Sequence, residues 1–285
     1  MNLTMRAGLP EDANACGAIC YRAFKTIAEE HHFLPDFPNT EAAVGLMNFA
    51  LANPGAWSVV AESEGKIVGS NFLWENPLIA GVGPITVDPA CQNASAGRQL
   101  MEQVLERATQ LKLAGVRLVQ SAYHNRSLAL YTKLGFDVQE PLSVMQGAPL
   151  SVGFQGYLVR PAMEADLATC NQLCLQVHGH DRNNELFGAI KTGTAMLVEH
   201  DGRITGYSTQ PGFLGHTVAA TNTGLKALIG AATSFPGPGF LLPSRNADVL
   251  RWCLQQGLRV VQPMTLMSRG LYNSPSGAFL PSVLY

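Results

Sequence analysis

The sequence predicts an α/β fold built from two tandem copies of one domain, and two observations lead to this prediction. Helix-like and strand-like segments alternate along the 285 residues, which is typical of layered α/β proteins. One stretch of sequence also occurs twice in the same order. Residues 6–12, followed by Cys16 and Cys20, return 154 positions later as residues 160–166, followed by Cys170 and Cys174.

Two further echoes support the duplication. Residues 62–69 (ESEGKIVG) resemble residues 199–206 (EHDGRITG), and residues 131–136 resemble residues 253–258. The repeated unit is much longer than a solenoid repeat, so each copy is expected to be a domain with its own core. Glycine and proline near residues 146–155 break the pattern, and this predicts domains at residues 1–147 and 155–285.

The first half of copy one is expected to contain two helices and three strands. Residues 3–7 are extended, and a helix runs from about Asp12, whose side chain can cap the first turn, to Glu30. A second helix covers residues 40–53. Valine-rich, alternating residues 57–62 and 66–74 flank Glu64-Gly65 and predict a hairpin. Residues 81–87 form a third strand.

The rest of copy one alternates helix and strand. Leu100, Val104 and Ala108 recur at helical spacing and predict a helix over residues 95–113. A strand over 116–122, a helix over 126–133 and a strand over 136–139 follow. The order supports an α/β layered arrangement.

Composition excludes several function classes. Lys plus Arg number 19 and Asp plus Glu number 21, so no positive excess is available to hold a nucleic acid. No apolar stretch is long enough to span a bilayer and no signal pattern opens the chain, so we expect no membrane partner and a cytoplasmic location. The CxxxC pairs are expected to be core residues, and no metal-ligand motif is present.

One segment has the features of an anion site. The strand ending at Val87 leads into a turn of small residues, including Ser95, Ala96 and Gly97, and then into a long helix. The first amides of a helix lack internal partners and lie at the positive end of its dipole. Small residues at that point let a pyrophosphate approach the backbone closely.

This segment resembles the phosphate loop of the GNAT superfamily of acyl-CoA-dependent N-acetyltransferases, with Gln92, Ser95 and Gly97 at the motif positions and Ser95 in place of a usual glycine. The resemblance implies tandem GNAT-like domains, each a mixed, mostly antiparallel twisted sheet flanked by helices, and acetyl-CoA as cofactor. The cofactor-binding residues that it implies are Ile85, Thr86, Val87, Gln92, Asn93, Ala94, Ser95, Ala96, Gly97, Arg98 and Asn125.

A second block, residues 125–136 (NRSLALYTKLGF), resembles the Asn-x-x-Ala/Ser-x-x-Leu-Tyr-x-Lys-x-Gly-Phe signature of the same superfamily. By that resemblance Tyr131 is the general acid that protonates the departing thiolate, and Asn125 lines the cofactor arm. The base stays open. Candidates near the substrate are Glu30, His31, His32 and His124, together with the carboxylate of the apolar C-terminal tail.

The second copy lacks both signatures. No counterpart of the small-residue turn precedes its helix near residue 224, and Cys253 takes the place of Tyr131. We therefore expect a non-catalytic domain that completes the substrate pocket or an interface. The resulting hypothesis is an N-acetyltransferase acting on a primary amine of a small molecule, with a homodimer as a further option. The alternative is a non-catalytic acyl-CoA-binding or sensory module.

Overall fold

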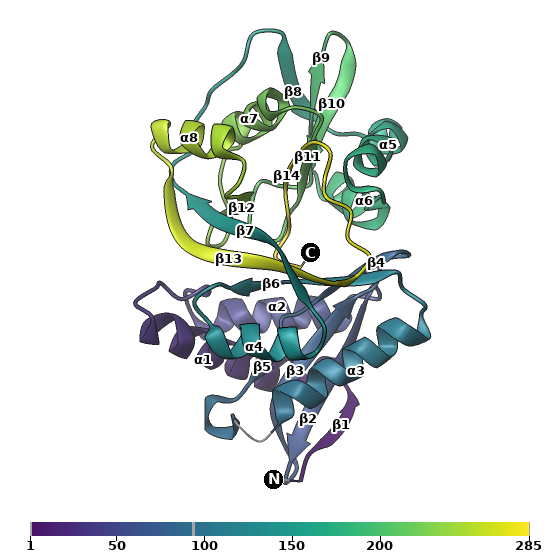
Figure 1. Cartoon of the computed structure of the whole chain (residues 1–285), viewed down its shortest axis with the longest axis vertical. Coiled ribbons are helices and arrows are strands. Elements are labelled where there is room, and N and C mark those ends of the chain that lie inside the picture. The colour runs from purple at the N-terminus through teal and green to yellow at the C-terminus, as the bar shows by residue number, and fades with distance from the viewer. Residues whose placement is uncertain (1, 93–94, 285) are drawn as a thin grey trace.

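The computed structural model describes residues 2–92 and 95–284, which form two halves stacked along the long axis (Figure 1). The lower half holds the first copy. Its elements are β1 (Thr4–Ala7), α1 (Ala13–Glu30), α2 (Thr40–Ala52), β2 (Ala56–Ser63), β3 (Lys66–Trp74), β4 (Ile79–Val82), β5 (Thr86–Val87), α3 (Ala96–Gln110), β6 (Gly115–Ser121), α4 (Asn125–Lys133) and β7 (Asp137–Gln146).

The second copy repeats this order in shortened form in the upper half. Its elements are β8 (Tyr157–Pro161), α5 (Leu167–His178), α6 (Asn183–Lys191), β9 (Met196–His200), β10 (Arg203–Ser208), β11 (Thr217–Ala219), α7 (Asn222–Ala231), β12 (Phe240–Pro243), α8 (Ala247–Gln255), β13 (Arg259–Gly270) and β14 (Ala278–Leu280). Both copies are sheets flanked by helices, so the predicted α/β class is confirmed.

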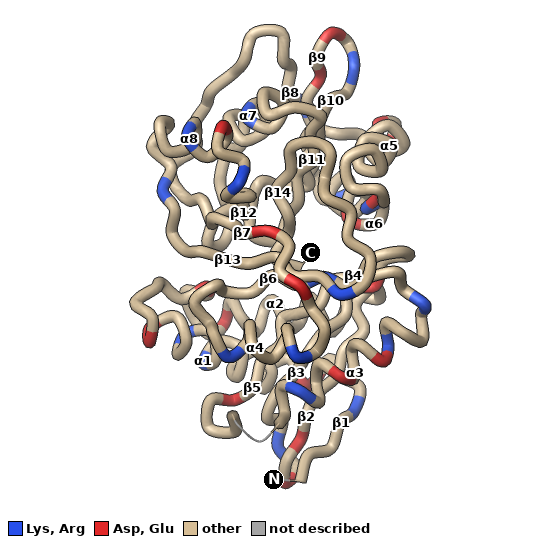
Figure 2. The backbone as a smooth tube through the Cα atoms, viewed as in Figure 1, with Lys and Arg blue, Asp and Glu red and all other residues tan. Residues whose placement is uncertain are grey.

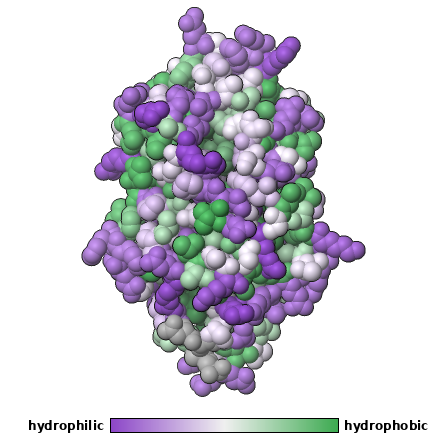
Figure 3. Space-filling view, viewed as in Figure 1, coloured by the Kyte–Doolittle hydropathy of each residue, from purple (hydrophilic) through white to green (hydrophobic). Residues whose placement is uncertain are grey.

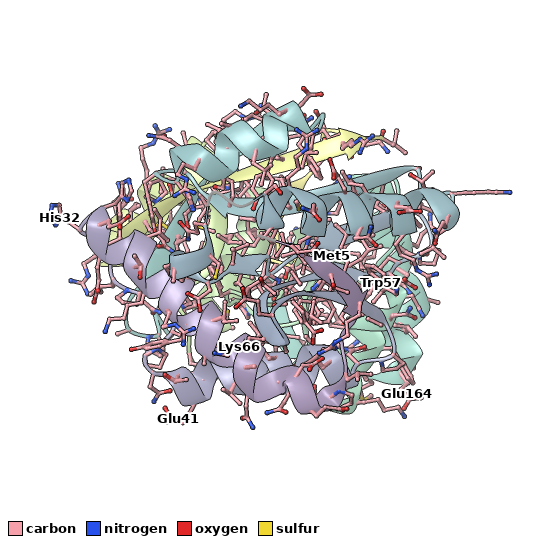
Figure 4. The ribbon with its side chains drawn as sticks, turned by 90° about the horizontal axis from the view of Figure 1, so that it is seen from below. Met5, His32, Glu41, Trp57, Lys66 and Glu164 are labelled. Atoms are coloured by element: carbon pink, nitrogen blue, oxygen red, sulfur yellow. The ribbon has the colours of Figure 1, made fainter. Side chains whose placement is uncertain are left out.

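Helices cover both faces of the lower sheet, as the alternation along β2 requires. Val59 and Ala61 face the apolar cluster of α3 and α4, whereas Val60 between them faces α1 and α2. Successive strand residues point to opposite faces, so each apolar position here has a helix to pack on. Figure 4 shows the two helix pairs on opposite sides of the sheet.

An identical ion cluster in the two halves confirms the internal repeat. Arg6 donates to Asp12 Oδ2 at 2.7 Å and to Glu62 Oε1 at 2.8 Å. In the second copy Arg160 donates to Asp166 Oδ2 at 2.7 Å and to Glu199 Oε1 at 2.9 Å. The cluster also corrects one expectation: the Asp12 side chain does not cap α1 but accepts from Arg6 and from the Leu9 amide.

The two copies exchange strands. The larger sheet runs β1-β2-β3-β4-β6-β13-β7-β12, with β5 beside β3, so β13 of the second copy lies between β6 and β7 of the first. Figure 1 shows β13 crossing the middle of the molecule beside β7. The smaller sheet runs β14-β11-β10-β9-β8. Long-range pairing of this kind carries no local sequence signal. Because β7 pairs with β13 and β12 of the second copy, it extends beyond the strand predicted over residues 136–139.

Strand exchange gives the halves a shared apolar cluster. Leu142 and Val144 of β7 pack with Leu241 of β12 and with Met264 and Leu266 of β13. Removal of the second copy would leave β6 and β7 with unpaired edges. The predicted domains at residues 1–147 and 155–285 therefore describe the two repeats of the sequence. They remain a prediction, because strands of the second repeat complete the sheet of the first.

The surface is mixed in character. Figure 2 shows Lys and Arg interspersed with Asp and Glu in both halves, and Figure 3 shows hydrophobic residues at mid-height of this face. None of the helices in residues 2–92 and 95–284 combines the length and hydrophobicity that a membrane span requires. Cys16, Cys20, Cys170 and Cys174 are fully buried and free, as predicted for core residues.

Candidate active site

The site begins where two neighbouring strands separate. Residues 81–87 were expected to form one strand, but the chain is divided into β4 and β5 by a cis peptide bond between Gly83 and Pro84. β4 pairs with β6 only as far as Gly81, opposite Arg117, and β5 pairs with β3 alone. Proline lacks an amide donor and does not continue a ladder. The end of β6 is thus left without a partner on this side.

Two cavities open at this separation. The first, named here the α3 cavity, has a volume of about 630 Å³. It lies among α1, β5, the beginning of α3 and the beginning of α4. Its lining includes every predicted cofactor residue that the structure describes: Ile85, Thr86, Val87, Gln92, Ser95, Ala96, Gly97, Arg98 and Asn125. Asn93 and Ala94 lie outside the described residues.

The beginning of α3 provides the anion-binding features that the sequence predicts. The Gln99 amide donates to Ser95 O at 3.0 Å, so the three amides before it precede the first helical turn. Gly97 faces the α3 cavity, and a Cβ built there would lie 3.7 Å from Leu130 and Val87, an ordinary contact. Packing of the protein itself therefore does not require glycine at position 97. The absence of a side chain leaves the backbone here open to the α3 cavity.

Polar side chains surround this turn. Arg126 donates to Gln92 Oε1 at 2.9 Å across the α3 cavity, and Arg98 pairs with Glu102 on the exposed side of α3. Both guanidinium groups belong to residues that line the cavity. Arginine is well suited to phosphate because it is always charged and has several donors.

Ser95 occupies a backbone position that favours glycine. Its φ is 62°, in the left-handed region, and its side chain makes no capping bond to α3; its Oγ instead accepts from Gln99 Nε2 at 2.9 Å. A left-handed conformation costs roughly 1–2 kcal/mol for a residue with a Cβ. The requirement for positive φ gives a physical reason for a glycine at this point of the motif.

Ser95→Gly is expected to raise the free energy of unfolding by up to about 1 kcal/mol, because the relief of the left-handed strain exceeds the added entropy of the unfolded chain. The change is measured from urea-induced unfolding. Ser95→Ala is the matched control, since it removes the same hydroxyl but keeps a Cβ. Equal stabilities of the two variants would contradict this account.

The second cavity, named here the central cavity, has a volume of about 520 Å³ and lies between the copies. The first copy contributes the loop after α1, part of α2, the β4–β5 turn and the end of β6. The second copy contributes Gln210, residues 212–214 and 236–238, Met264 and the tail residues Val283 and Leu284. The tail is held there because the Val283 amide donates to Phe213 O at 2.9 Å and Ser282 Oγ donates to Leu214 O at 2.8 Å.

The two cavities share part of their lining. The residues common to both are Phe24, Ile27, Ile85, His124, Ser127 and Tyr131. Tyr131 is only 6% exposed, and burial raises the pKa of its hydroxyl. The hydroxyl is therefore protonated at neutral pH and can donate a proton between the two cavities.

His124 lies at the same junction and begins α4. Its Nδ1 accepts from the Ser127 amide at 3.4 Å, and this contact leaves the ring proton on Nε2. Burial, followed by the charges of Arg126 and His31, lowers the pKa of His124. The ring is thus neutral at pH 7, and its Nε2 is a donor rather than a base.

The other predicted substrate residues are placed differently. Glu30 and His31 line the α3 cavity, and His31 Nδ1 lies 2.9 Å from Ile27 O. His32 lines neither cavity, is exposed, and points away from the molecule in Figure 4. It follows the end of α1 with a φ of 61°, and this turn directs the side chain outward. The structure therefore gives no support to substrate contact by His32.

Three polar residues of the central cavity region were not identified from sequence. Asp36 lies in the loop after α1, and Gln120 lies on β6; both line the cavity. Gln120 is 5% exposed, and its Nε2 has no hydrogen-bond partner among the described residues. Gln262 of β13 donates to Asp36 Oδ1 at 3.0 Å across 226 positions of sequence. A buried amide in a strand carries no motif, so no local signal could have identified these residues.

The second copy has no equivalent site among its described residues. Its α7 corresponds to α3, but the Thr221 hydroxyl caps it by accepting from the Gly224 amide at 3.2 Å. Cys253 replaces Tyr131 and is buried in an apolar cluster. Arg182 and His216 of this copy are buried and meet at Glu185. In the second copy, the positions equivalent to the copy-one site are therefore used for helix capping and for core packing.

The fold thus has two adjoining cavities, one at the beginning of α3 with two arginines in its lining and one that is mostly apolar. Residues 20–136 match the model of the acetyltransferase (GNAT) family. This segment of the N-terminal half is therefore similar to the GNAT acetyltransferases, a family that uses acetyl-CoA. No curated protein matches the chain in sequence.

Solved structures share the fold of the whole chain. A presumed acetyltransferase of Pyrococcus horikoshii has a TM-score of 0.74 at 17% identity, covering 99% of this chain and 92% of its own. A GCN5-related N-acetyltransferase of Sphaerobacter thermophilus has a TM-score of 0.63 at 15% identity, covering 95% and 96%. A tandem GNAT protein from the clavulanic acid biosynthesis pathway has a TM-score of 0.58 at 15% identity, covering 96% and 100%. The tandem architecture predicted from the duplication is confirmed.

Proposed function

We propose that this protein is an N-acetyltransferase that uses acetyl-CoA to acetylate a primary amine of a small molecule. The observation that supports this most strongly is the meeting of two cavities at Tyr131. The α3 cavity is the cofactor site and the central cavity is the acceptor site. A shared wall allows an acyl group held in one to reach an amine held in the other.

The residues of the α3 cavity fit acetyl-CoA. The first amides of α3, with Gly97 beside them, hold the pyrophosphate, and Arg98 and Arg126 supply positive charge. Asn125 and the end of β5 line the remainder of the arm. Bound acetyl-CoA supplies an activated acyl thioester at the junction.

Tyr131 holds a proton on Oη at the place where negative charge would develop on a departing group. Its burial keeps that proton in place at neutral pH. Apolar residues of both copies line most of the central cavity, and a ligand that displaces water from it would strengthen each polar interaction there. General acid catalysis of this kind contributes typically about 10²–10⁴-fold.

Direct attack by the amine is favoured over an acyl-enzyme. None of the six residues common to the two cavities is a cysteine, and Cys91 lines the α3 cavity alone. The hydroxyl of Ser127 lies 2.7 Å from Gln120 Oε1 and 2.9 Å from His124 O, whereas His124 Nδ1 faces the Ser127 amide. The nucleophile–base pair that covalent catalysis requires is therefore not formed at this serine.

The test combines binding with turnover. Acetyl-CoA at about 100 times its dissociation constant is expected to stabilise the protein by about 2.7 kcal/mol, which is measured as a rise in Tm. Thiol release with a panel of primary amines then identifies transfer. Binding of acetyl-CoA without transfer to any amine would favour the acyl-CoA-binding or sensory module, and absence of binding would contradict both functions.

A further inference from the structure

The lining of the central cavity has an unusual charge composition. Of its described lining residues, Asp36 is the one carboxylate, and none is lysine or arginine. Most of the others are apolar side chains, glycine or proline. A ligand of this cavity thus meets one anionic group in surroundings that offer no positive charge from the described residues.

Asp36 is held in place from the second copy. Gln262 Nε2 donates to its Oδ1 at 3.0 Å, and Tyr123 Oη donates to Gln262 Oε1 at 3.4 Å. The Tyr123 ring stacks on Phe33 with 4.3 Å between centroids, which anchors the loop that carries Asp36. The amide that holds Asp36 therefore comes from the exchanged strand β13.

A strand irregularity directs Gln262 to this position. The register of β13 against β7 shifts between Val260 and Gln262, and one extra residue in a strand reverses which side chains face a given side. Gln262 is 4% exposed, and Val261 packs in the shared apolar cluster. The bulge thus places an amide rather than an apolar side chain beside Asp36.

The charged form of Asp36 has no Lys or Arg to pair with among the described residues that line the central cavity. Burial raises the pKa of its carboxyl, and the single hydrogen bond from Gln262 offsets part of that effect. A carboxylate in apolar surroundings is costly unless it is paired. A ligand cation beside Asp36 would supply the pairing that the described residues of the cavity do not.

We propose that Asp36 binds the ammonium group of the acceptor, and that the acceptor is an amine with an apolar body and no acidic group. This inference rests on the proposed function, since it names the substrate class of that site. An amino acid would bring a second carboxylate into a cavity whose described lining has no cationic side chain. A polyamine would bring further ammonium groups with no second carboxylate to receive them.

The test compares acceptors that differ in one group. Phenethylamine and phenylalanine share a ring and an amine and differ only in the carboxylate. We expect kcat/KM for phenethylamine to exceed that for phenylalanine and for spermidine by about 10²-fold, which reflects the cost of an unpaired buried charge. A preference for phenylalanine or spermidine would overturn this inference and leave the acetyltransferase function standing.

Asp36→Asn keeps the shape and removes the charge. We expect KM for phenethylamine to rise by at least about 10-fold, with the affinity for acetyl-CoA unchanged, because the α3 cavity does not include Asp36. Calorimetric titration of phenethylamine into the protein measures its affinity for the central cavity without turnover. This inference can therefore be tested even if no acetyl transfer is found. Equal phenethylamine affinity for the native protein and Asp36→Asn would overturn it.

Glu41→Gln is the matched control. Glu41 lies five positions along the chain, at the beginning of α2, and is exposed on the outer surface in Figure 4. The substitution removes the same charge outside both cavities, so KM and kcat are expected to stay at the native values. A rise in KM as large as that of Asp36→Asn would show a general charge effect and would overturn the assignment to Asp36.

Discussion

Tyr131→Phe is expected to lower kcat by about 10²–10⁴-fold while acetyl-CoA affinity stays within about twofold of the native value. The substitution removes one oxygen from a side chain that is 6% exposed and packs in the apolar cluster of α3 and β6. The ring contacts that support the fold are kept. The proton at the junction of the two cavities is lost.

Steady-state thiol release gives kcat, and calorimetry with acetyl-CoA gives the affinity. Tyr157→Phe is the control, because it removes the same hydroxyl from a tyrosine of the second copy. The ring of Tyr157 stacks on His200 and lies outside both cavities. Native turnover in Tyr131→Phe would remove Tyr131 as the general acid. A parallel loss of acetyl-CoA affinity would instead assign the hydroxyl to cofactor binding.

Gly97→Trp is expected to abolish acetyl-CoA binding and leave the protein folded. The position has space for a Cβ in the free protein, so a side chain there enters the α3 cavity rather than the core. It then occupies the volume in front of the first α3 amides, where the pyrophosphate is proposed to bind. The rise in Tm with acetyl-CoA should disappear, and the Tm without ligand should change little.

A tryptophan introduced outside the α3 cavity shows whether the loss of acetyl-CoA binding depends on the position of the bulky side chain. Gly188 lies in α6 with open space around its Cβ position, so Gly188→Trp should keep the native response to acetyl-CoA. If Gly97→Trp kept that response as well, the cofactor would have to bind elsewhere, and the assignment of the α3 cavity would be wrong. Loss of the response in both variants would indicate a fold defect.

Local sequence was sufficient for the elements and for the cofactor side of the site. The hairpin around Glu64-Gly65, the α3 helix and the block from Asn125 to Phe136 each lie within one continuous stretch, where periodicity and turn chemistry act over a few residues. All nine described residues predicted for the cofactor line one cavity for the same reason. Their roles in binding and catalysis remain predictions.

The acceptor side could not be predicted in this way. The contact between Asp36 and Gln262 joins positions 226 residues apart and depends on a bulge in an exchanged strand. The separation of β4 from β5 depends on Gly83-Pro84, which interrupts an otherwise continuous valine-rich pattern. His32 is predicted near the substrate because it lies at the end of the first helix, where the resemblance places the substrate mouth, but the backbone turn after α1 directs it to solvent.

Sequence alone determined that the chain is a duplicated α/β protein, that one copy keeps the loop and the tyrosine, and that the other does not. Those are properties of short segments. Only the tertiary structure decided that β13 completes the sheet of the other copy, that the tail residues Val283 and Leu284 close the central cavity, and that Asp36 faces it. Burial between strands far apart in sequence arises from packing of the whole chain, and no short segment encodes it.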